Sequence, residues 1–218
     1  MLEYAGDRFD EPIKAQIMIK KYLHLISGVD MTCGKILEEP EWQNLTNNTM
    51  VIFTTDNGYY HAEHGIADKH YAHQESVRVP LIIRDPRIPE KLAGGRNDYL
   101  TLSIDLAPTI LQAANIEVPA RMQGSDMSLL YRSEEKPLWR QRFYYEYPGI
   151  TGHLGHLHVQ ALVRKDYKYI YWPIYKYEEL FHLTTDPFEE HDLARDGSFN
   201  ATMDKMRKEF KEVQAAAQ

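Results

Sequence analysis

The sequence predicts an α/β fold followed by a smaller α+β subdomain. Three features carry this prediction: a long helical apolar pattern near the start, short β-branched segments without alternation in the middle, and tyrosine-rich alternating segments near the end. Apolar runs without alternation are typical of strands buried on both faces of a parallel sheet. Helices between such strands indicate an α/β layer. We therefore expect a partial parallel sheet with flanking helices over residues 1–117 and the subdomain over residues 118–218.

The first predicted helix runs from Asp10 to Glu38, with Asp10 as N-cap and Pro12 in the first turn. Glu39-Pro40 is expected to end it, because the residue before a proline disfavours helical geometry. Apolar residues recur at steps of three and four, which predicts one apolar face that packs against something large. This face consists of Tyr22, Ile26, Val29, Cys33 and Ile36.

Three buried strands and a helix are expected in the middle of the chain. The strands are Met50–Thr55, Val79–Ile83 and Tyr99–Leu102. The helix extends from about Ile104 to Ala114, with Pro108 near its first turn. This alternation of helix and strand is typical of an α/β sheet.

The last third of the chain has a different composition. Eight of the 15 tyrosines fall between Tyr144 and Tyr177, in segments that alternate as antiparallel strands with one solvated face do. Residues 200–217 are expected to form an amphipathic helix. Its apolar positions are Met203, Met206, Phe210 and Val213.

Charge and hydropathy exclude several classes of protein. The formal net charge of −7 opposes binding to nucleic acid or to anionic lipid. The longest apolar runs, such as Leu81–Ile83, are far shorter than the roughly 20 residues of a membrane-spanning helix. The first residues lack the charged-then-apolar pattern of a secretory signal, so we expect either a cytosolic protein or a true N-terminus upstream of Met1. The single cysteine, Cys33, excludes an internal disulfide and is expected to be a small buried hydrophobe.

A candidate metal site follows the first predicted strand. Asp56 and Asn57 offer a carboxylate and an amide carbonyl, and Gly58 lets the backbone turn sharply. Hard oxygen donors of this kind suit Ca²⁺ or Mg²⁺ better than zinc. The alternative interpretation is structural, because Asp-Asn-Gly is also a common turn sequence.

Basic side chains crowd the next segment of the chain. Lys69 offers an ammonium that can neutralise a sulfate or phosphate oxygen, and a histidine can protonate a leaving alcohol. Each histidine is also explained by an ordinary loop role in which it bonds the backbone. The histidines of this segment are His61, His64, His70 and His73, and an exposed loop further on contains His153, His156 and His158.

The order and spacing of these motifs resemble the second half of a sulfatase catalytic domain. The similar segments are Thr55–Gly58, Glu63–Gly65, Asp68–His70, Gln74–Arg84, Ser103–Leu111, Gly124–Ser125, Ala161–Tyr169 and Glu179–Pro187. Over roughly residues 13 to 195, the chain is similar to the type I, formylglycine-dependent sulfatases. The resemblance implies an alkaline-phosphatase-like α/β fold.

The resemblance also implies roles for individual residues. Asp56 and Asn57 are expected to coordinate a divalent cation, usually Ca²⁺, and Lys69 to contact the sulfate group. His61, His64 and His70 are expected to line the same loop as substrate-binding residues. The family's formylglycine derives from a cysteine in a Cys-x-Pro/Ala-Ser-Arg motif, whereas Gly34, Lys35 and Ile36 follow Cys33 here. We therefore expect an N-terminally truncated, inactive fragment.

The resemblance implies a sulfuric ester hydrolase that acts on a sulfated small molecule or glycan. Two alternatives stay open: a phosphate or phosphonate monoester hydrolase of the same superfamily, and a non-catalytic, anion-binding half-domain completed by a partner. The family's usual locations are periplasmic, secreted or lysosomal. A truncated chain would leave apolar surface exposed, so self-association is also expected.

Overall fold

The computed structural model describes residues 9–135, 137–149 and 158–217. Contacts within the chain divide it into two compact units, Met1–Pro86 and Arg87–Gln218. The boundary expected between residues 117 and 118 rests on composition, which this division by contacts does not test, and it stays a prediction.

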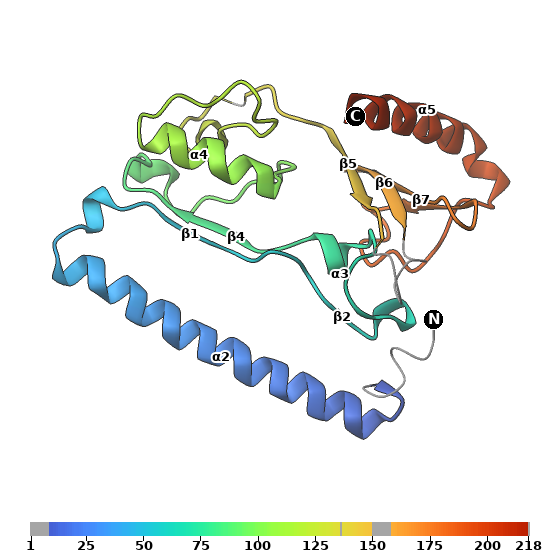
Figure 1. Ribbon diagram of the computed structural model, residues 1–218, viewed down its shortest axis with the longest axis horizontal. Coiled ribbons are helices and arrows are strands. Elements are labelled where there is room, and N and C mark those ends of the chain that lie inside the picture. Colours follow the sequence, from blue (N-terminus) through green and yellow to red (C-terminus); the bar gives the residue numbers. More distant parts are fainter. Residues whose placement is uncertain (1–8, 136, 150–157, 218) are drawn as a thin grey trace. The chain divides into compact units, whose positions relative to one another are not determined.

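The first unit contains one long helix, α2 (Pro12–Trp42), drawn in blue in Figure 1. Its N-cap is Glu11 and not the expected Asp10, whose carboxylate instead accepts a hydrogen bond from Lys14 at 2.8 Å. The helix also continues past Pro40 to Trp42. Pro40 lies in the last turn, where the missing N–H costs one hydrogen bond and the helix is about to end.

The apolar face expected on α2 exists, but it is not packed. Ile26 is 46% exposed, Val29 52% and Ile36 63%. No residue of α2 whose burial is described counts as buried, and Cys33 is half-buried. The exposed apolar surface expected on this chain is therefore present on α2, and the large surface against which this face packs stays a prediction.

Two of the three expected strands are present in the first unit, as β1 (Val51–Thr54) and β4 (Leu81–Arg84), but neither contains a buried residue, so their expected burial on both faces is wrong. They pair antiparallel, with Val51 opposite Arg84, so the parallel pairing expected for these two strands is wrong. Parallel neighbours need a crossover connection, usually a long helix. The connection here contains only short elements: β2 (Tyr60–His61), a 3-10 turn (Glu63–Gly65), β3 (Ala67–Asp68) and α3 (Gln74–Val77).

The second unit begins with a segment that the sequence predicts only in part. The expected helix is confirmed as α4 (Leu106–Ala113), preceded by a 3-10 turn at Ser103–Asp105. The expected strand Tyr99–Leu102 does not form. The carbonyl of Leu100 instead accepts hydrogen bonds from Trp139 Nε1 at 2.9 Å and from Arg140 at 3.1 Å. Side chains thus bond a carbonyl that would pair with a neighbouring strand in a sheet.

The antiparallel subdomain is confirmed. Four strands lie in the order β5-β6-β7-β8, and each pair is antiparallel. The strands are β5 (Arg142–Tyr147), β6 (Val159–Arg164), β7 (Tyr167–Trp172) and β8 (Tyr177–His182). Further 3-10 turns lie at Thr46–Asn48, Glu90–Leu92, Met127–Leu130 and Gly197–Phe199.

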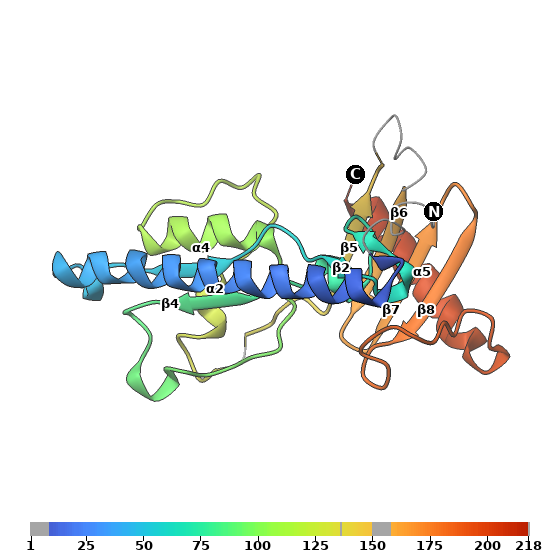
Figure 2. The ribbon, with the colours of Figure 1, turned by 90° about the horizontal axis from the view of Figure 1, so that it is seen from below.

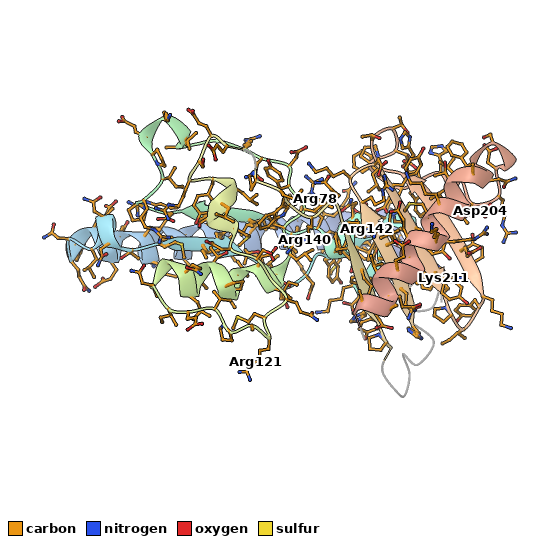
Figure 3. The ribbon with its side chains drawn as sticks, turned by 90° about the horizontal axis from the view of Figure 1, so that it is seen from above. Arg78, Arg121, Arg140, Arg142, Asp204 and Lys211 are labelled. Atoms are coloured by element: carbon orange, nitrogen blue, oxygen red, sulfur yellow. The ribbon has the colours of Figure 1, made fainter. Side chains whose placement is uncertain are left out.

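The expected last helix, α5 (Asn200–Ala216), covers one face of this sheet, as Figures 1 and 2 show. Charged residues such as Asp204 and Lys211 are exposed along α5 (Figure 3). Apolar side chains from three strands and the helix form the core between them: Leu162, Tyr169, Leu180, Met203, Met206 and Phe210. Burial of this core is the main source of stability for the subdomain.

A buried ion pair ties the loop after β8 to the sheet. Lys168 Nζ lies 2.6 Å from Glu189 Oε1, and both side chains are fully buried. Each of these buried charges needs its partner, because an unpaired charge in the interior is costly.

The described helices include none with the length and apolar character required to cross a bilayer.

Candidate active site

The site predicted from the sequence begins at the exit of β1. The Asp56 side chain is exposed and accepts hydrogen bonds from the Thr55 hydroxyl at 3.1 Å and from the Asn57 amide at 2.9 Å. These bonds, the Thr55 hydroxyl first, hold the pKa of Asp56 below its usual range, and the charge of Lys69 adds a smaller effect. Asp56 is therefore an ionised, accessible carboxylate at neutral pH.

The structure brings Lys69 to Asn57 across 12 positions of sequence. Lys69 Nζ donates a hydrogen bond to Asn57 Oδ1 at 3.1 Å. Asn57 Nδ2 donates to the Gly58 carbonyl at 2.8 Å, and this bond fixes which side of the amide faces the lysine. A carboxylate, an amide oxygen and an ammonium thus gather at one short turn.

The backbone around Lys69 is strained. Asp68 and His70, on either side of it, have φ angles of 80° and 90°, in the left-handed region that non-glycine residues rarely adopt. Such conformations persist only where the surroundings impose them, and they are frequent at functional sites. Lys69 is therefore held between two residues whose backbone conformation costs stability.

The expected substrate-binding histidines separate into different environments. The His61 ring contacts those of Tyr22 and Tyr59, with ring centroids 4.3 Å and 4.9 Å away. The His64 ring is stacked on that of His73 at 4.2 Å, and His64 Nε2 lies 3.5 Å from Glu75 Oε2. These contacts give both residues structural roles. Their role in substrate binding stays a prediction.

His70 lies beside Lys69, and burial lowers its pKa below the ordinary value. The neutral imidazole therefore predominates at pH 7. Of the loop histidines, His153 and His156 lie outside the described residues. His158 is described, and its Nε2 lies 3.3 Å from Glu146 Oε1.

Sequence reasoning missed Tyr60 and the main-chain contacts of α3 that support this turn. Tyr60 is fully buried, and its hydroxyl lies 2.9 Å from His73 Nδ1. The Gly58 amide donates to the Ser76 carbonyl at 2.8 Å. A Cβ on Gly58 would lie 1.9 Å from the Glu75 carbonyl oxygen, so only glycine allows this approach. The residues of α3 belong to the Gln74–Arg84 segment, one of the motifs recognised in the sequence. A hydrogen bond to a main-chain carbonyl, however, does not depend on the residue type and cannot be predicted from the sequence.

The donor set partly fits the expected calcium ion. Asp56 supplies an exposed carboxylate, and the Asn57 oxygen is held toward Lys69 on the same turn. Both are hard oxygen ligands, as Ca²⁺ and Mg²⁺ prefer. Ca²⁺ takes about 6 to 8 such ligands, so water or other groups must complete the coordination.

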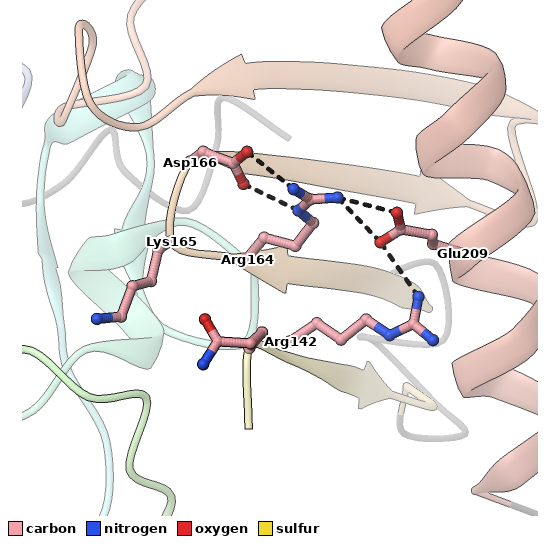
Figure 4. A pocket seen from close by; sticks show the side chains of 6 residues that line it. Arg142, Arg164, Lys165, Asp166 and Glu209 are labelled. Atoms are coloured by element: carbon pink, nitrogen blue, oxygen red, sulfur yellow. Dashed lines mark hydrogen bonds and ion pairs between the residues drawn. The ribbon is translucent and has the colours of Figure 1, made fainter. Parts of the chain in front are cut away.

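Charged side chains also gather at two places in the second unit. The first is a cavity of about 480 Å³ at the ends of β5 and β6 (Figure 4), lined by Gln141, Arg142, Arg164, Lys165, Asp166 and Glu209. Arg142 and Arg164 both bond Glu209, and Lys165 lies 3.2 Å from Asp98, so the cations are already neutralised. This network joins α5 to the sheet.

The second place is an acidic cluster on the loop after β8. It comprises Asp186, Glu190 and His191. The Asp186 carboxylate accepts the main-chain amides of the other two residues, at 3.1 and 2.9 Å. Those bonds explain the cluster as a stabilised turn.

Comparison with known proteins decides the family. The family model for sulfatases matches residues 3–116, and that for the C-terminal region of N-sulphoglucosamine sulphohydrolase matches residues 62–216. The chain belongs to the sulfatase family. The residues that resembled this family in the sequence, from Thr55 to Pro187, fall within these two matches.

Curated relatives of this sulfatase-family chain are longer proteins. It is 31% identical over 188 residues to an N-acetylglucosamine-6-O-sulfatase of Bacteroides thetaiotaomicron, a match that covers 84% of this chain and 31% of that protein. It is 29% identical over 215 residues to a multifunctional alkaline phosphatase superfamily protein of Trinickia caryophylli, covering 91% and 40%. The chain thus spans about a third of the Bacteroides relative and two fifths of the Trinickia relative.

Solved structures confirm the fold class. A protein solved in complex with its substrate D-glucosamine-2-N,6-O-disulfate matches with a TM-score of 0.86 at 26% identity, covering 98% of this chain and 44% of that one. A phosphonate monoester hydrolase of Agrobacterium radiobacter matches with a TM-score of 0.78 at 21% identity, covering 88% and 40%. At that identity the second likeness shows the fold alone.

Proposed function

We propose that this chain supplies the cation- and sulfate-binding part of a sulfuric ester hydrolase that acts on a sulfated carbohydrate. One observation carries the proposal: Lys69 Nζ lies 3.1 Å from Asn57 Oδ1, beside the ionised Asp56. If the two oxygens hold a divalent cation, that cation and the ammonium would present two positive charges to a tetrahedral oxyanion.

Asp56 and Asn57 would hold the divalent cation, Ca²⁺ by family resemblance. When bound there, a divalent cation supplies positive charge against the oxygens of a sulfate ester. Lys69 neutralises a further oxygen and orients the group. The neutral His70 lies next to Lys69 in the chain and can exchange a proton with a bound substrate. No residue of this chain is assigned as nucleophile, because the Cys-x-Pro/Ala-Ser-Arg motif does not occur in its 218 residues.

The names of relatives support the substrate class. The Bacteroides relative and a human relative, 30% identical over 132 residues, are both N-acetylglucosamine 6-sulfatases. A Drosophila melanogaster relative, 28% identical over 137 residues, is an extracellular sulfatase homologue. We therefore propose a sulfated glycan as substrate and a periplasmic, secreted or lysosomal location.

Calcium titration of the 218-residue chain by isothermal calorimetry tests the cation site. Asp56→Ala should abolish measurable binding, because it removes the only carboxylate of the pair, and Asn57→Ala should weaken binding at least tenfold. Asp30→Ala and Asn48→Ala are matched controls on exposed positions elsewhere in the first unit. Unchanged calcium affinity in Asp56→Ala and Asn57→Ala would contradict the proposed site.

A second candidate function is hydrolysis of phosphate or phosphonate monoesters. The Trinickia relative belongs to the alkaline phosphatase superfamily, and a cation with a lysine also holds phosphate. The chain can be joined behind a sulfatase N-terminal region that carries the Cys-x-Pro/Ala-Ser-Arg motif, and assayed on paired sulfate and phosphate esters. Faster release of sulfate supports the first candidate, and faster release of phosphate supports the second. Calcium binding with turnover of neither ester supports the non-catalytic alternative.

A further inference from the structure

Ser76 is bonded to both halves of the candidate site. It lies in α3 and is 5% exposed. Its main-chain carbonyl accepts the Gly58 amide at 2.8 Å, which docks the turn that carries Asp56 and Asn57. Its side-chain hydroxyl accepts the His70 amide at 3.1 Å, directly beside Lys69.

The second bond falls where the backbone is strained. His70 has a φ of 90° and Asp68 a φ of 80°, so Lys69 is held between two left-handed residues. A backbone in this region relaxes unless its surroundings fix it. The Ser76 hydroxyl helps to fix this conformation, because it accepts the hydrogen bond of the His70 amide.

We infer that Ser76 is a positioning residue, whose hydroxyl holds the Asp68–His70 backbone so that the Lys69 ammonium reaches Asn57. The inference rests on the proposed function for its binding measurements, which use sulfate and calcium, and not for the hydrogen-exchange measurement. The two bonds of Ser76 come from different atoms, so they can be separated by substitution. Ser76→Ala removes the hydroxyl and leaves the carbonyl bond to Gly58 in place.

Hydrogen exchange of the 218-residue chain tests the positioning without any ligand. In Ser76→Ala we expect the His70 amide to exchange about tenfold faster, as loss of one hydrogen bond allows, while the Gly58 amide keeps the wild-type rate. Ser76→Thr retains the hydroxyl and should restore the slow exchange at His70. Ser128→Ala removes the hydroxyl of another buried serine, in the second unit, and should leave both amides unchanged.

Binding measurements test the consequence for the site, with inorganic sulfate and calcium as probes. We expect Ser76→Ala to bind sulfate about tenfold more weakly in the presence of calcium, and to bind calcium with an affinity within about twofold of wild type. The cation ligands stay docked through the Ser76 carbonyl, whereas Lys69 loses its support. A purely structural role would weaken both ligands together.

Three results would overturn the inference. The first is an unchanged His70 exchange rate in folded Ser76→Ala. The second is an equal acceleration of Gly58, His70 and the rest of the unit, which indicates general destabilisation. The third is an equal loss of sulfate and calcium affinity. If the wild-type chain binds neither probe, the proposed function fails, and the exchange rates alone decide whether Ser76 holds the lysine segment.

Discussion

Asp105 shows how much of the second unit depends on one side chain. It is fully buried, and its carboxylate accepts the amides of Leu102 and Ser125, both at 2.8 Å, and two hydrogen bonds from Arg140. A buried carboxylate is tolerated only when its oxygens are bonded and its charge is matched. Here one residue joins the start of α4, the Gly124–Ser125 segment and the strand entry at β5.

Asp105→Asn should therefore destabilise the chain. The substitution removes the charge that matches the half-buried Arg140, at a cost of about 3 kcal/mol in the free energy of unfolding. Urea denaturation followed by circular dichroism measures the change. Asp98→Asn is the control, since Asp98 is exposed and forms a surface ion pair with Lys165, and its effect should stay below about 0.5 kcal/mol. Equal stabilities of the two variants would contradict the role given to Asp105.

At the scale of single residues, the sequence predicted which side chains lie together better than what supports them. The structure brings Lys69 to Asn57, as the resemblance implied, while the roles of Asp56, Asn57 and Lys69 stay predictions. The environments of His61 and His64 could not be predicted, because ring stacking depends on Tyr22 and His73, which come from other elements. The contribution of Ser76 could not be predicted, because one of its two hydrogen bonds is made by its main-chain carbonyl.

Gly58 allows the turn after β1 to pack closely against α3. Gly58→Ala would place a Cβ 1.9 Å from the Glu75 carbonyl oxygen, so the turn must leave α3 or the helix must shift. We expect a loss of calcium affinity of at least about tenfold, because Asp56 and Asn57 move with the turn. Calorimetric calcium titration of the variant measures it.

Gly28 supplies a matched control within the same unit. It lies in α2, and a Cβ there meets nothing within 4 Å. Gly28→Ala should leave calcium affinity unchanged and stabilise the helix by about 0.5–1 kcal/mol, because alanine loses less backbone entropy than glycine. A similar effect of both substitutions on calcium binding would refute the docking of the turn on α3.

Strand β8 carries a carboxyl group that makes stability depend on pH. Burial raises the pKa of Glu179 from 4.5 to about 7, and the nearby charges of Asp192 and Glu189 add to the shift. Because the folded state binds this proton more tightly than the unfolded chain, the stabilisation is present at low pH and is lost as pH rises from about 4.5 to 7. The Trp172 indole donates a hydrogen bond to Glu179 Oε2 at 2.6 Å.

Glu179→Gln should remove this dependence. We expect the variant to match wild type at pH 4 and to exceed it at pH 8 by about 3 kcal/mol, since the pKa is raised from 4.5 to about 7 and each pKa unit corresponds to about 1.4 kcal/mol. Denaturation midpoints at both pH values measure the difference. Glu178→Gln is the contrast on the same strand: Arg207 lowers the pKa of Glu178, so its loss should destabilise at pH 8. A difference between wild type and Glu179→Gln that does not vary with pH would contradict the assignment.

At the scale of elements, most positions and the antiparallel pairing of β5 to β8 were predictable, whereas the pairing of β1 with β4 was not. β1, β4, α4 and α5 lie close to their expected ranges, because apolar periodicity determines where an element forms. The antiparallel pairing of β1 with β4 depends on the connection between them, which the sequence shows only as a loop. Tyr99–Leu102 has the composition of a strand, but the Leu100 carbonyl accepts hydrogen bonds from the side chains of Trp139 and Arg140.

The whole molecule exposes a long apolar surface on α2. Exposed contiguous apolar residues favour association, so the chain should self-associate at high concentration. Ile26→Glu with Val29→Glu should shift light-scattering mass toward the monomer. Lys20→Glu changes the net charge by the same two units at an exposed position outside this face and should not. A wild-type chain that stays monomeric at millimolar concentration would contradict the prediction.

Whole-molecule organisation was the least predictable level. The apolar pattern of α2 correctly indicated a helix, but periodicity cannot say what covers it, and the described chain leaves its residues exposed. The compositional change near Pro119 predicted the antiparallel subdomain, yet contacts divide the chain at Pro86. Elements between these points pack with later segments of the chain, as the bonds from Asp105 to Ser125 and Arg140 show.

On our account, Asp56, Asn57 and Lys69 form one site for a cation and an oxyanion. Sulfate titrations of the 218-residue chain with and without saturating calcium test this most directly. If the three groups share a site, calcium should raise sulfate affinity at least about fivefold, and sulfate should raise calcium affinity by the same factor, because the anion relieves repulsion between the two positive charges. Lys69→Met should weaken sulfate binding at least about tenfold while calcium still binds, because the ammonium is one of the two positive charges that face the anion. Sulfate affinity that is independent of calcium, or that is unchanged in Lys69→Met, would contradict the account.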